Sequence, residues 1–400
     1  MNQKNIRKVC VFLGSRAHYS SLISIMEHIQ KSDKLEQILI VGASAILDKY
    51  GEAINIIERD GFKVNEKLFM IIEGENPQTM AKSTGLGLIE LSSIFNKYKP
   101  NFTVIVADRF EMLACAIASA YNNIPIAHIQ GGEVSGSIDE SIRHAITKLS
   151  HLHFPSNELA KQRILQMGED ERYVFNFGCP RIDTVKKILD QPYRFDEINN
   201  IIRTQGVGDV FDINNHFLLI AQHPVTTEYG EGKQQITNTL QAIKEITQER
   251  DIPAIILWPN ADAGSDDIAE GIRYFREHEE EKNLHFIKNF SFEHYIWLMD
   301  KTLCLIGNSS SGIREGGFIG TPVVNIGTRQ NDRARASNVL DCDYSYENIK
   351  ESIEKQITHG KYKSETIYGD GNAGKNIIRI LETIDIKVQK RFMTRNISNI

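Results

Sequence analysis

The sequence predicts an α/β protein with two Rossmann-like, doubly wound domains. The chain has 400 residues, and at roughly 100–200 residues per domain this length suits two domains. Short apolar runs alternate with amphipathic stretches, as is typical of parallel sheets whose strands are joined by helices. The alternation restarts after a polar stretch at residues 194–208, which reads as a helix or linker. Two such halves predict an active site in the cleft between the domains.

The first half shows six strand signals. They lie at residues 9–13, 38–41, 102–107, 124–129, 153–155 and 174–177. Helical spacing of apolar residues is found at 22–29, 111–121 and 138–149. The six apolar runs named first are each too short for a buried helix, which favours strands for those segments.

The second half repeats the pattern. Strand signals lie at residues 217–221, 254–258, 286–287, 303–306 and 323–326, with a helix at 236–247. A last helical pattern covers 373–384. We therefore predict an N-terminal domain at 1–190 and a C-terminal domain at 205–372. Residues 373–400 are expected to pack back on the N-terminal domain.

Composition excludes several classes of protein. The net charge is −6, and no basic patch of the kind that binds nucleic acid stands out in the sequence. The cysteines show no CxxC spacing, so neither a metal nor a redox motif is predicted; they are Cys10, Cys115, Cys179, Cys304 and Cys342. The N-terminal apolar run is too short for a signal peptide, and no run reaches the roughly 18 residues of a membrane span. We expect a cytoplasmic enzyme without metal or cofactor.

Three segments suit an anionic ligand. Residues 14–20 (GSRAHYS) follow the first strand and open a helix, where backbone N–H groups favour an anion; an ordinary turn with a solvated arginine explains them equally well. Residues 307–312 (GNSSSG) are a stronger signal, because small residues let a diphosphate approach backbone amides. Glu315 follows, and because a carboxylate repels phosphate we expect it to accept from ribose hydroxyls. Residues 327–335 add three arginines.

Ionisable residues gather at the ends of predicted strands. Asp108 and Arg109 end one strand, and residues 128–133 (HIQGGE) end the next. Asp139 and Arg143 are one turn apart on a helix, where a plain salt bridge is the alternative. His223 ends the first strand of the second half and precedes a proline. A histidine at that position, opposite carboxylates, suits ligand binding or proton transfer.

Seven motifs, in matching order from about residue 8 to about 335, resemble the hydrolysing UDP-N-acetylglucosamine 2-epimerases. They are GSRAHYS, ADRFEM, HIQGGEVSGSIDESIRHAITK, HPVTTE, PNADAGSD, GNSSSGIRE and GTPVVNIGTRQ. That family includes bacterial enzymes of sialic-acid biosynthesis and the epimerase half of the animal bifunctional enzyme. The resemblance implies a glycosyltransferase-B-type fold with UDP bound mainly by the C-terminal domain.

The resemblance also implies residue roles. It assigns UDP contacts to Arg16, Ala17, Ser20, Arg109, Ser309, Ser310, Glu315 and Arg329. Asn260, Ser311 and Gly312 are further candidates for substrate binding. The resemblance places Asp108, Asp139, Arg143 and His223 in the catalytic region. Glu133 is added as a candidate acid or base because it is a carboxylate three residues after Gln130 in the same loop. Two positions depart from the family pattern: His18 replaces a residue that is often acidic, and Gln130 replaces the glutamate of the animal enzyme. Since an amide does not exchange protons at useful pH, we assign Gln130 to substrate positioning.

The implied reaction converts UDP-N-acetylglucosamine and water to N-acetylmannosamine and UDP. Anti elimination gives 2-acetamidoglucal, and hydration at C1 with reprotonation of C2 follows. The same reaction on UDP-2,4-diacetamido-2,4,6-trideoxyglucose, an inverting glycosyltransferase and a non-catalytic sugar-nucleotide sensor remain alternatives. The resemblance favours a homodimer or homotetramer, with a UDP-sugar substrate and neither nucleic acid nor membrane as a partner.

Overall fold

The chain folds into two compact α/β units in a computed structural model. The structure describes residues 6–50, 52–74, 76–134, 138–225, 228–259, 264–279 and 282–394. Unit 1 comprises residues 1–134, 138–184 and 368–400, and unit 2 comprises 135–137 and 185–367. Among the described residues, no helix has the length and apolar character that crossing a bilayer requires.

Unit 1 is built on a six-stranded parallel sheet with the strand order β3-β2-β1-β4-β5-β6. Its strands are β1 (Arg7–Leu13), β2 (Leu35–Gly42), β3 (Glu66–Leu68), β4 (Phe102–Val106), β5 (Ile126–Ile129) and β6 (Leu152–Phe154). Its helices are α1 (Arg16–Lys31), η1 (Ala43–Ile46), η2 (Asp48–Tyr50), α2 (Ala53–Arg59), α3 (Pro77–Tyr98), α4 (Phe110–Tyr121), α5 (Ile138–Leu149), α6 (Glu158–Gln166), η3 (Glu171–Tyr173) and α15 (Ala373–Thr383). Helix α7 (Pro180–Leu189) begins in unit 1 and ends in unit 2.

Unit 2 is built on a seven-stranded sheet with the strand order β13-β12-β11-β8-β9-β10-β7. Its strands are β7 (Val207–Gly208), β8 (Leu218–Ala221), β9 (Ala254–Leu257), β10 (Leu284–Ile287), β11 (Cys304–Gly307), β12 (Val323–Ile326) and β13 (Val339–Cys342). Only the edge strand β7 pairs antiparallel. Its helices are α8 (Phe195–Gln205), α9 (Gly232–Arg250), α10 (Ser265–His278), α11 (Phe292–Lys301), α12 (Ser310–Ile313), α13 (Glu315–Ile319) and α14 (Tyr346–His359).

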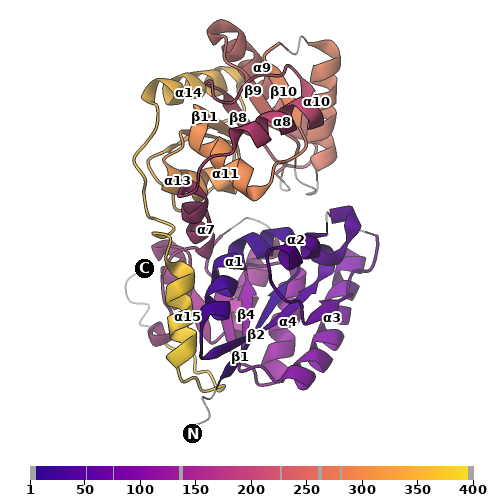
Figure 1. The fold of residues 1–400 in the computed structure, drawn as a ribbon, viewed down its shortest axis with the longest axis vertical. Helices are drawn as coiled ribbons and strands as arrows, with labels where there is room; N and C mark the ends of the chain where they lie inside the picture. The colour runs from indigo at the N-terminus through magenta and orange to yellow at the C-terminus, as the bar shows by residue number, and fades with distance from the viewer. Residues whose placement is uncertain are drawn as a thin grey trace. The chain divides into compact units, whose positions relative to one another are not determined.

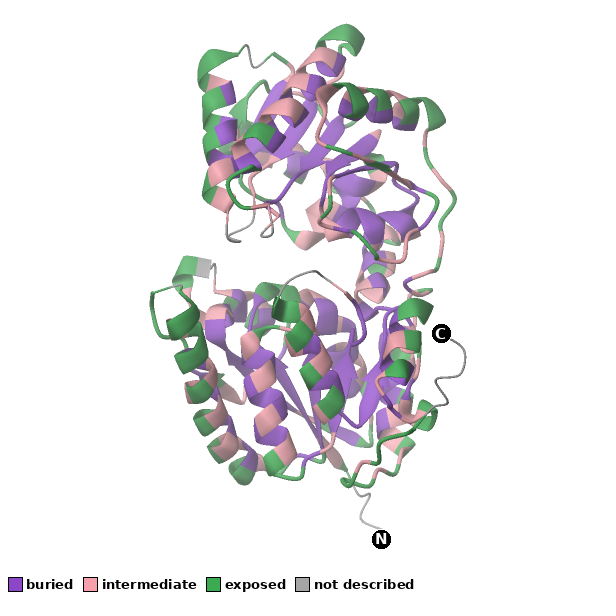
Figure 2. Ribbon diagram, turned by 180° about the vertical axis from the view of Figure 1, so that it is seen from behind, coloured by how far each residue is buried: buried purple, intermediate pink, exposed green. Residues whose placement is uncertain are grey.

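Both sheets are covered on both faces, which explains why their strands are apolar on both sides. In β1, Val9, Val11 and Leu13 pack with α1 and α15 on one face, whereas Cys10 and Phe12 pack with α3 and α4 on the other. In Figure 2 the strands of each unit are buried and the outer faces of the helices are exposed. Helix α15 lies beside α1 in unit 1 (Figure 1).

The structure differs from the sequence predictions at several points. The predicted strand at 174–177 is wrong, because only a single bridge joins Val174 to His153. The polar stretch that begins at 194 forms α8 and the short β7. Glu315 does not share one helix with the serines before it: α12 ends at Ile313 and α13 begins at Glu315.

Candidate active site

Most of the predicted site residues follow the strands at which each sheet reverses its strand order, or the next strand along: Gln130 and Glu133 follow β5, and Arg329 follows β12. In unit 1 the reversal lies between β1 and β4, and in unit 2 between β8 and β11. Both sheets have the 3-2-1-4-5-6 order of a Rossmann fold, unit 2 with β7 added at one edge. In such sheets ligands bind outside the carboxyl ends of the strands at this reversal point.

A buried arginine joins three segments of unit 1. Arg143 on α5 is 4% exposed and forms an ion pair with Asp108, which follows β4. Its Nη1 also donates to the backbone oxygen of Glu133, in the loop after β5, at 2.6 Å. Arg143 therefore holds both carboxylate-bearing loops next to α5.

His128 supports the backbone just before Asp108. Ala107 has a φ of +62°, and its carbonyl oxygen lies 2.9 Å from Nε2 of His128. Because a carbonyl only accepts, Nε2 carries the proton and Nδ1 is unprotonated. The Thr147 hydroxyl lies 3.2 Å from Nδ1 and donates to the Arg143 carbonyl at 3.0 Å. Burial lowers the pKa of His128 to about 3, so the ring is neutral at physiological pH.

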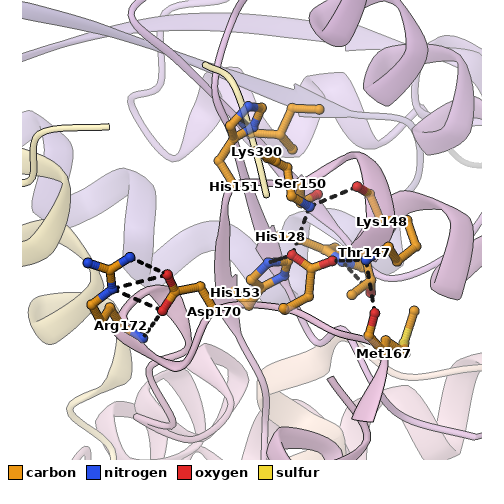
Figure 3. A network of polar contacts seen from close by, with 12 residues as sticks. His128, Thr147, Lys148, Ser150, His151, His153, Met167, Asp170, Arg172 and Lys390 are labelled. Carbon is orange, nitrogen blue, oxygen red and sulfur yellow. Dashed lines mark hydrogen bonds and ion pairs between the residues drawn. The ribbon is translucent and has the colours of Figure 1, made fainter. Parts of the chain in front are cut away.

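A second buried network of polar side chains lies next to these groups, and its role is structural. Figure 3 shows His128 and Thr147 near His153, Lys148 and Lys390. Glu169 accepts from His153 at 3.0 Å and from Lys148 at 2.5 Å, and pairs with Lys390 at 2.8 Å. Burial alone raises the pKa of Glu169, but these partners outweigh it and hold the value at about 2. The network fastens the C-terminal segment to unit 1.

The turn after β1 lies against another charged pair. Nε of Arg109 donates to Oε1 of Glu111 at 3.0 Å, and Glu111 is completely buried. The Gly14 amide donates to Nδ1 of His18 at 3.2 Å. Burial, and then the charge of Arg109, lower the pKa of His18 to about 3. Sequence analysis missed Glu111, because an acidic residue in the first turn of a helix looks like ordinary dipole compensation.

The remaining predicted residues of unit 1 occupy varied environments. Arg16 and Ala17 are exposed at the start of α1, and the Ser20 hydroxyl donates to the Ala17 carbonyl at 2.9 Å. Asp139 is exposed in the first turn of α5. Gln130 has a φ of +63°, and its Nε2 donates to Sγ of Cys179 at 3.2 Å.

Asn308 links three strand ends in unit 2. Its side chain accepts from the His223 amide at 2.8 Å and donates to the His223 carbonyl at 2.9 Å. Its backbone oxygen accepts from Arg329 at 3.2 Å and from Gln330 at 2.8 Å. Gly307 before it has a φ of +129°, and a Cβ there would lie 2.3 Å from the Ala221 oxygen. The signal for Asn308 was present in the GNSSSG motif, but the prediction used only its serines and glycine.

The serine loop is internally bonded. The Ser311 hydroxyl lies 2.7 Å from the hydroxyls of both Ser309 and Tyr295. Ser310 is half-buried, and Glu315 is 1% exposed. Gly312 is needed for packing, since a Cβ there would lie 2.9 Å from Val323.

Arg329 lies in a loop that is anchored at the preceding residue. Thr328 donates to Glu228, which also accepts from Tyr344 at 2.7 Å. His223 is buried, and burial together with the charge of Arg329 lowers its pKa to about 3. Arg329 and His223 thus meet through Asn308.

In each unit the structure brings some of the predicted residues together, and in unit 2 Asn308, which was not predicted, joins them. Asp108, Arg143 and Glu133 are in contact in unit 1, and His223, Asn308 and Arg329 in unit 2. Asn260 lies outside the described residues. Within the described ranges, no three His, Cys, Asp or Glu side chains gather as metal ligands would. All five cysteines are free thiols, and four of them are buried.

Comparison with known proteins identifies the family. A family model described as UDP-N-acetylglucosamine 2-epimerase matches residues 27–382. The hydrolysing UDP-N,N'-diacetylbacillosamine 2-epimerase of Legionella pneumophila is 32% identical over 96% of this chain and 98% of its own. The UDP-N-acetylglucosamine 2-epimerase of Neisseria meningitidis serogroup B is 27% identical over 98% of this chain and 100% of its own.

A solved structure agrees in fold. The crystal structure of the Neisseria meningitidis UDP-GlcNAc 2-epimerase bound to UDP-GlcNAc matches with a TM-score of 0.76 and 19% identity, over 94% of this chain and 99% of that one. The two-domain, glycosyltransferase-B-type fold predicted from the sequence is thereby confirmed. On the family model and the 32% identical relative, the chain belongs to the UDP-N-acetylglucosamine 2-epimerase family.

Proposed function

We propose that the chain is a hydrolysing 2-epimerase of a UDP-linked 2-acetamido sugar, which releases UDP and the free sugar with C2 inverted. The observation that carries the proposal is the pair of carboxylate-bearing loops joined by the buried Arg143. A proton must leave C2 from one face and return to the other, and two carboxylates at one site suit that exchange.

Elimination is the first step. The C1–O bond breaks, its electron pair leaves with UDP, and a carboxylate removes the proton from C2 to give the glycal. Asp108, which forms an ion pair with the buried Arg143, is one candidate for this base. Glu133 and Asp139 are the other candidates for proton transfer. Water then adds at C1, and C2 receives a proton on the opposite face.

Loss of UDP requires stabilisation of negative charge on the diphosphate. We assign this to Arg16 and Arg109 in unit 1, and to Arg329 and the amides of residues 309–312 in unit 2. Preorganised cations and N–H donors stabilise a developing anion without reorganising during the reaction. Glu315 is assigned to the ribose hydroxyls.

Two sugars are candidates. The sequence motifs favour UDP-N-acetylglucosamine, as the Neisseria relative's name also does. A specific observation favours the second, a UDP-linked 2,4-diacetamido-2,4,6-trideoxyglucose. The 32% identical Legionella relative is named a hydrolysing UDP-N,N'-diacetylbacillosamine 2-epimerase, and a 31% identical Campylobacter jejuni relative is named a hydrolysing GDP/UDP-N,N'-diacetylbacillosamine 2-epimerase.

Product analysis tests the proposal. Purified protein is incubated separately with each UDP-sugar in EDTA, and products are followed by NMR. The proposal expects UDP and a free 2-epimer from at least one substrate. A nucleotide-linked epimer would show a non-hydrolysing reaction, and binding without turnover of either sugar would contradict an enzymatic role on these substrates.

A further inference from the structure

Glu111 is a buried carboxylate that none of the roles above uses. It lies in the first turn of α4, is 0% exposed, and accepts from Arg109 through Oε1. Its Oε2 is buried without a hydrogen-bond partner among the described residues. A Cβ at Gly14 would lie 2.5 Å from Cγ of Glu111, so the turn after β1 closes directly over this side chain.

The two side chains of the Arg109–Glu111 ion pair differ in their exposure to solvent. The Arg109 side chain is 49% exposed, whereas that of Glu111 is completely buried. Engagement of Nε by Glu111 fixes the plane of the guanidinium, whose Nη edge is the one that binds phosphate in a bidentate manner. A buried anion thus sets the orientation of a cation that reaches solvent.

The charges around Glu111 come from three elements. Arg109 is the N-cap residue of α4, Asp139 lies on α5, and the titratable His18 lies on α1. Burial raises the pKa of Glu111, the charge of Arg109 opposes this, and Asp139 raises it further. His18 is neutral there, so Arg109 is the cation that balances the carboxylate.

We propose that Glu111 is a positioning residue that orients Arg109 toward the diphosphate of the nucleotide and takes up a proton from solvent when that diphosphate binds. The inference rests on the proposed function. A bound diphosphate becomes a second anion beside Arg109, so the ionised form of Glu111 loses part of its stabilisation and protonation becomes more favourable. No other bond forms or breaks.

The proton is counted by calorimetry with UDP as the probe. Binding is measured in pairs of buffers with different ionisation enthalpies, from about pH 5.5 to 8.5, for the wild type and Glu111→Gln. Glutamine keeps the size and the acceptor oxygen but takes up no proton. Protons that UDP itself gains or loses on binding contribute equally to the counts for both proteins. We expect an excess uptake of up to about one proton in the wild type over part of this range. Equal proton counts at every pH overturn the proposal.

A double-mutant cycle tests the orientation. Glu111→Met keeps the volume but removes the acceptor, and UDP should bind about tenfold more weakly. The same change should have almost no effect in an Arg109→Ala background, because Glu111 acts through that arginine. An equal loss in both backgrounds overturns the proposal. Glu140→Gln, a half-buried carboxylate on α5 near His144, is the control and should bind UDP as the wild type does.

These outcomes separate the two proposals. If the wild type does not bind UDP, both the proposed function and the role of Glu111 are wrong. If UDP binds and both Glu111 variants match the wild type in affinity and proton count, only the role of Glu111 is wrong. Thermal melting confirms folding, and where Glu111→Met fails to fold, the proton count of Glu111→Gln decides alone.

Discussion

The two units share one strand order but present different chemistry at the point where that order reverses. In unit 1 the interactions are ion pairs with one buried member each: Asp108 pairs with the buried Arg143, and Arg109 pairs with the buried Glu111. In unit 2 the hub is a neutral amide, Asn308, which joins strand ends through four hydrogen bonds.

This difference suggests a division of labour. Charged groups that are held in place suit proton transfer, whereas neutral donors, small residues and an anchored arginine suit binding of a nucleotide. Under the proposed function, changes at Asp108 and Glu133 in unit 1 should reduce turnover. Changes at Arg329 in unit 2 should reduce nucleotide affinity, as should changes at the Arg109–Glu111 pair, which is the exception in unit 1. Variants that reverse this assignment would break the comparison.

The largest expected effect is from Asp108→Asn. The amide keeps the shape but loses the capacity to accept the C2 proton, so turnover should fall by about two to four decades with UDP affinity largely kept. Steady-state kinetics and calorimetry measure the two quantities. Asp170→Asn is a matched control, since Asp170 also pairs with an arginine and its side chain is also 16% exposed. Wild-type turnover in Asp108→Asn would remove this residue from the mechanism.

A second comparison lies within the loop after β5. Glu133→Gln should reduce turnover and C2 deuterium exchange by about tenfold to a hundredfold. Gln130→Ala should do much less, because its amide donates to Cys179 and transfers no proton. Abolished exchange in Gln130→Ala together with a mild Glu133→Gln would reverse the two roles.

Arg329→Ala should weaken UDP binding with less effect on turnover at saturation. A hydrogen bond to a charged group contributes about 1.5–3 kcal/mol, which corresponds to roughly one to two decades in affinity. Calorimetry with UDP measures it. Lys233→Ala is the control, because this cation of unit 2 pairs with Glu270 at 2.8 Å. Unchanged affinity in Arg329→Ala would contradict a nucleotide site in unit 2.

The last prediction concerns stability in acid and not activity. His18 and His128 in unit 1 and His223 in unit 2 each have a pKa of about 3 in the folded protein, mainly through burial. Their unfolded value is about 6.5, so the unfolded chain binds protons that the folded chain does not. Stability should be complete above about pH 6.5 and fall toward pH 3, by at most about 1.4 kcal/mol per pH unit per histidine. Calorimetric melting at pH 7.5 and 5 tests this, and equal midpoints would contradict it.

Most strands could be predicted because both faces of each sheet are covered, so that the residues of each strand form a continuous apolar run. β1 is an example, with Val9 to Leu13 buried in the two layers. β3 was missed because Glu66 and Lys67 give no apolar run, and the false strand at 174–177 packs its aromatic rings without forming a ladder.

The candidate site could be predicted only where a residue type suggests chemistry by itself. Asp108, Glu133 and Arg329 follow strands and carry charge, so the sequence singled them out. Glu111 and Asn308 owe their roles to contacts with residues 97 and 85 positions away, Gly14 and His223, and neither contact has a local sequence signal.

The most direct test of the central claim is isotope incorporation during turnover. The enzyme is given its UDP-sugar in D2O and, separately, in oxygen-18 water, and the released sugar is analysed by NMR and mass spectrometry. Elimination followed by hydration predicts deuterium at C2, oxygen-18 at C1 of the sugar and none in UDP. A released epimer that retains protium at C2, or UDP that carries the oxygen label, would contradict the mechanism.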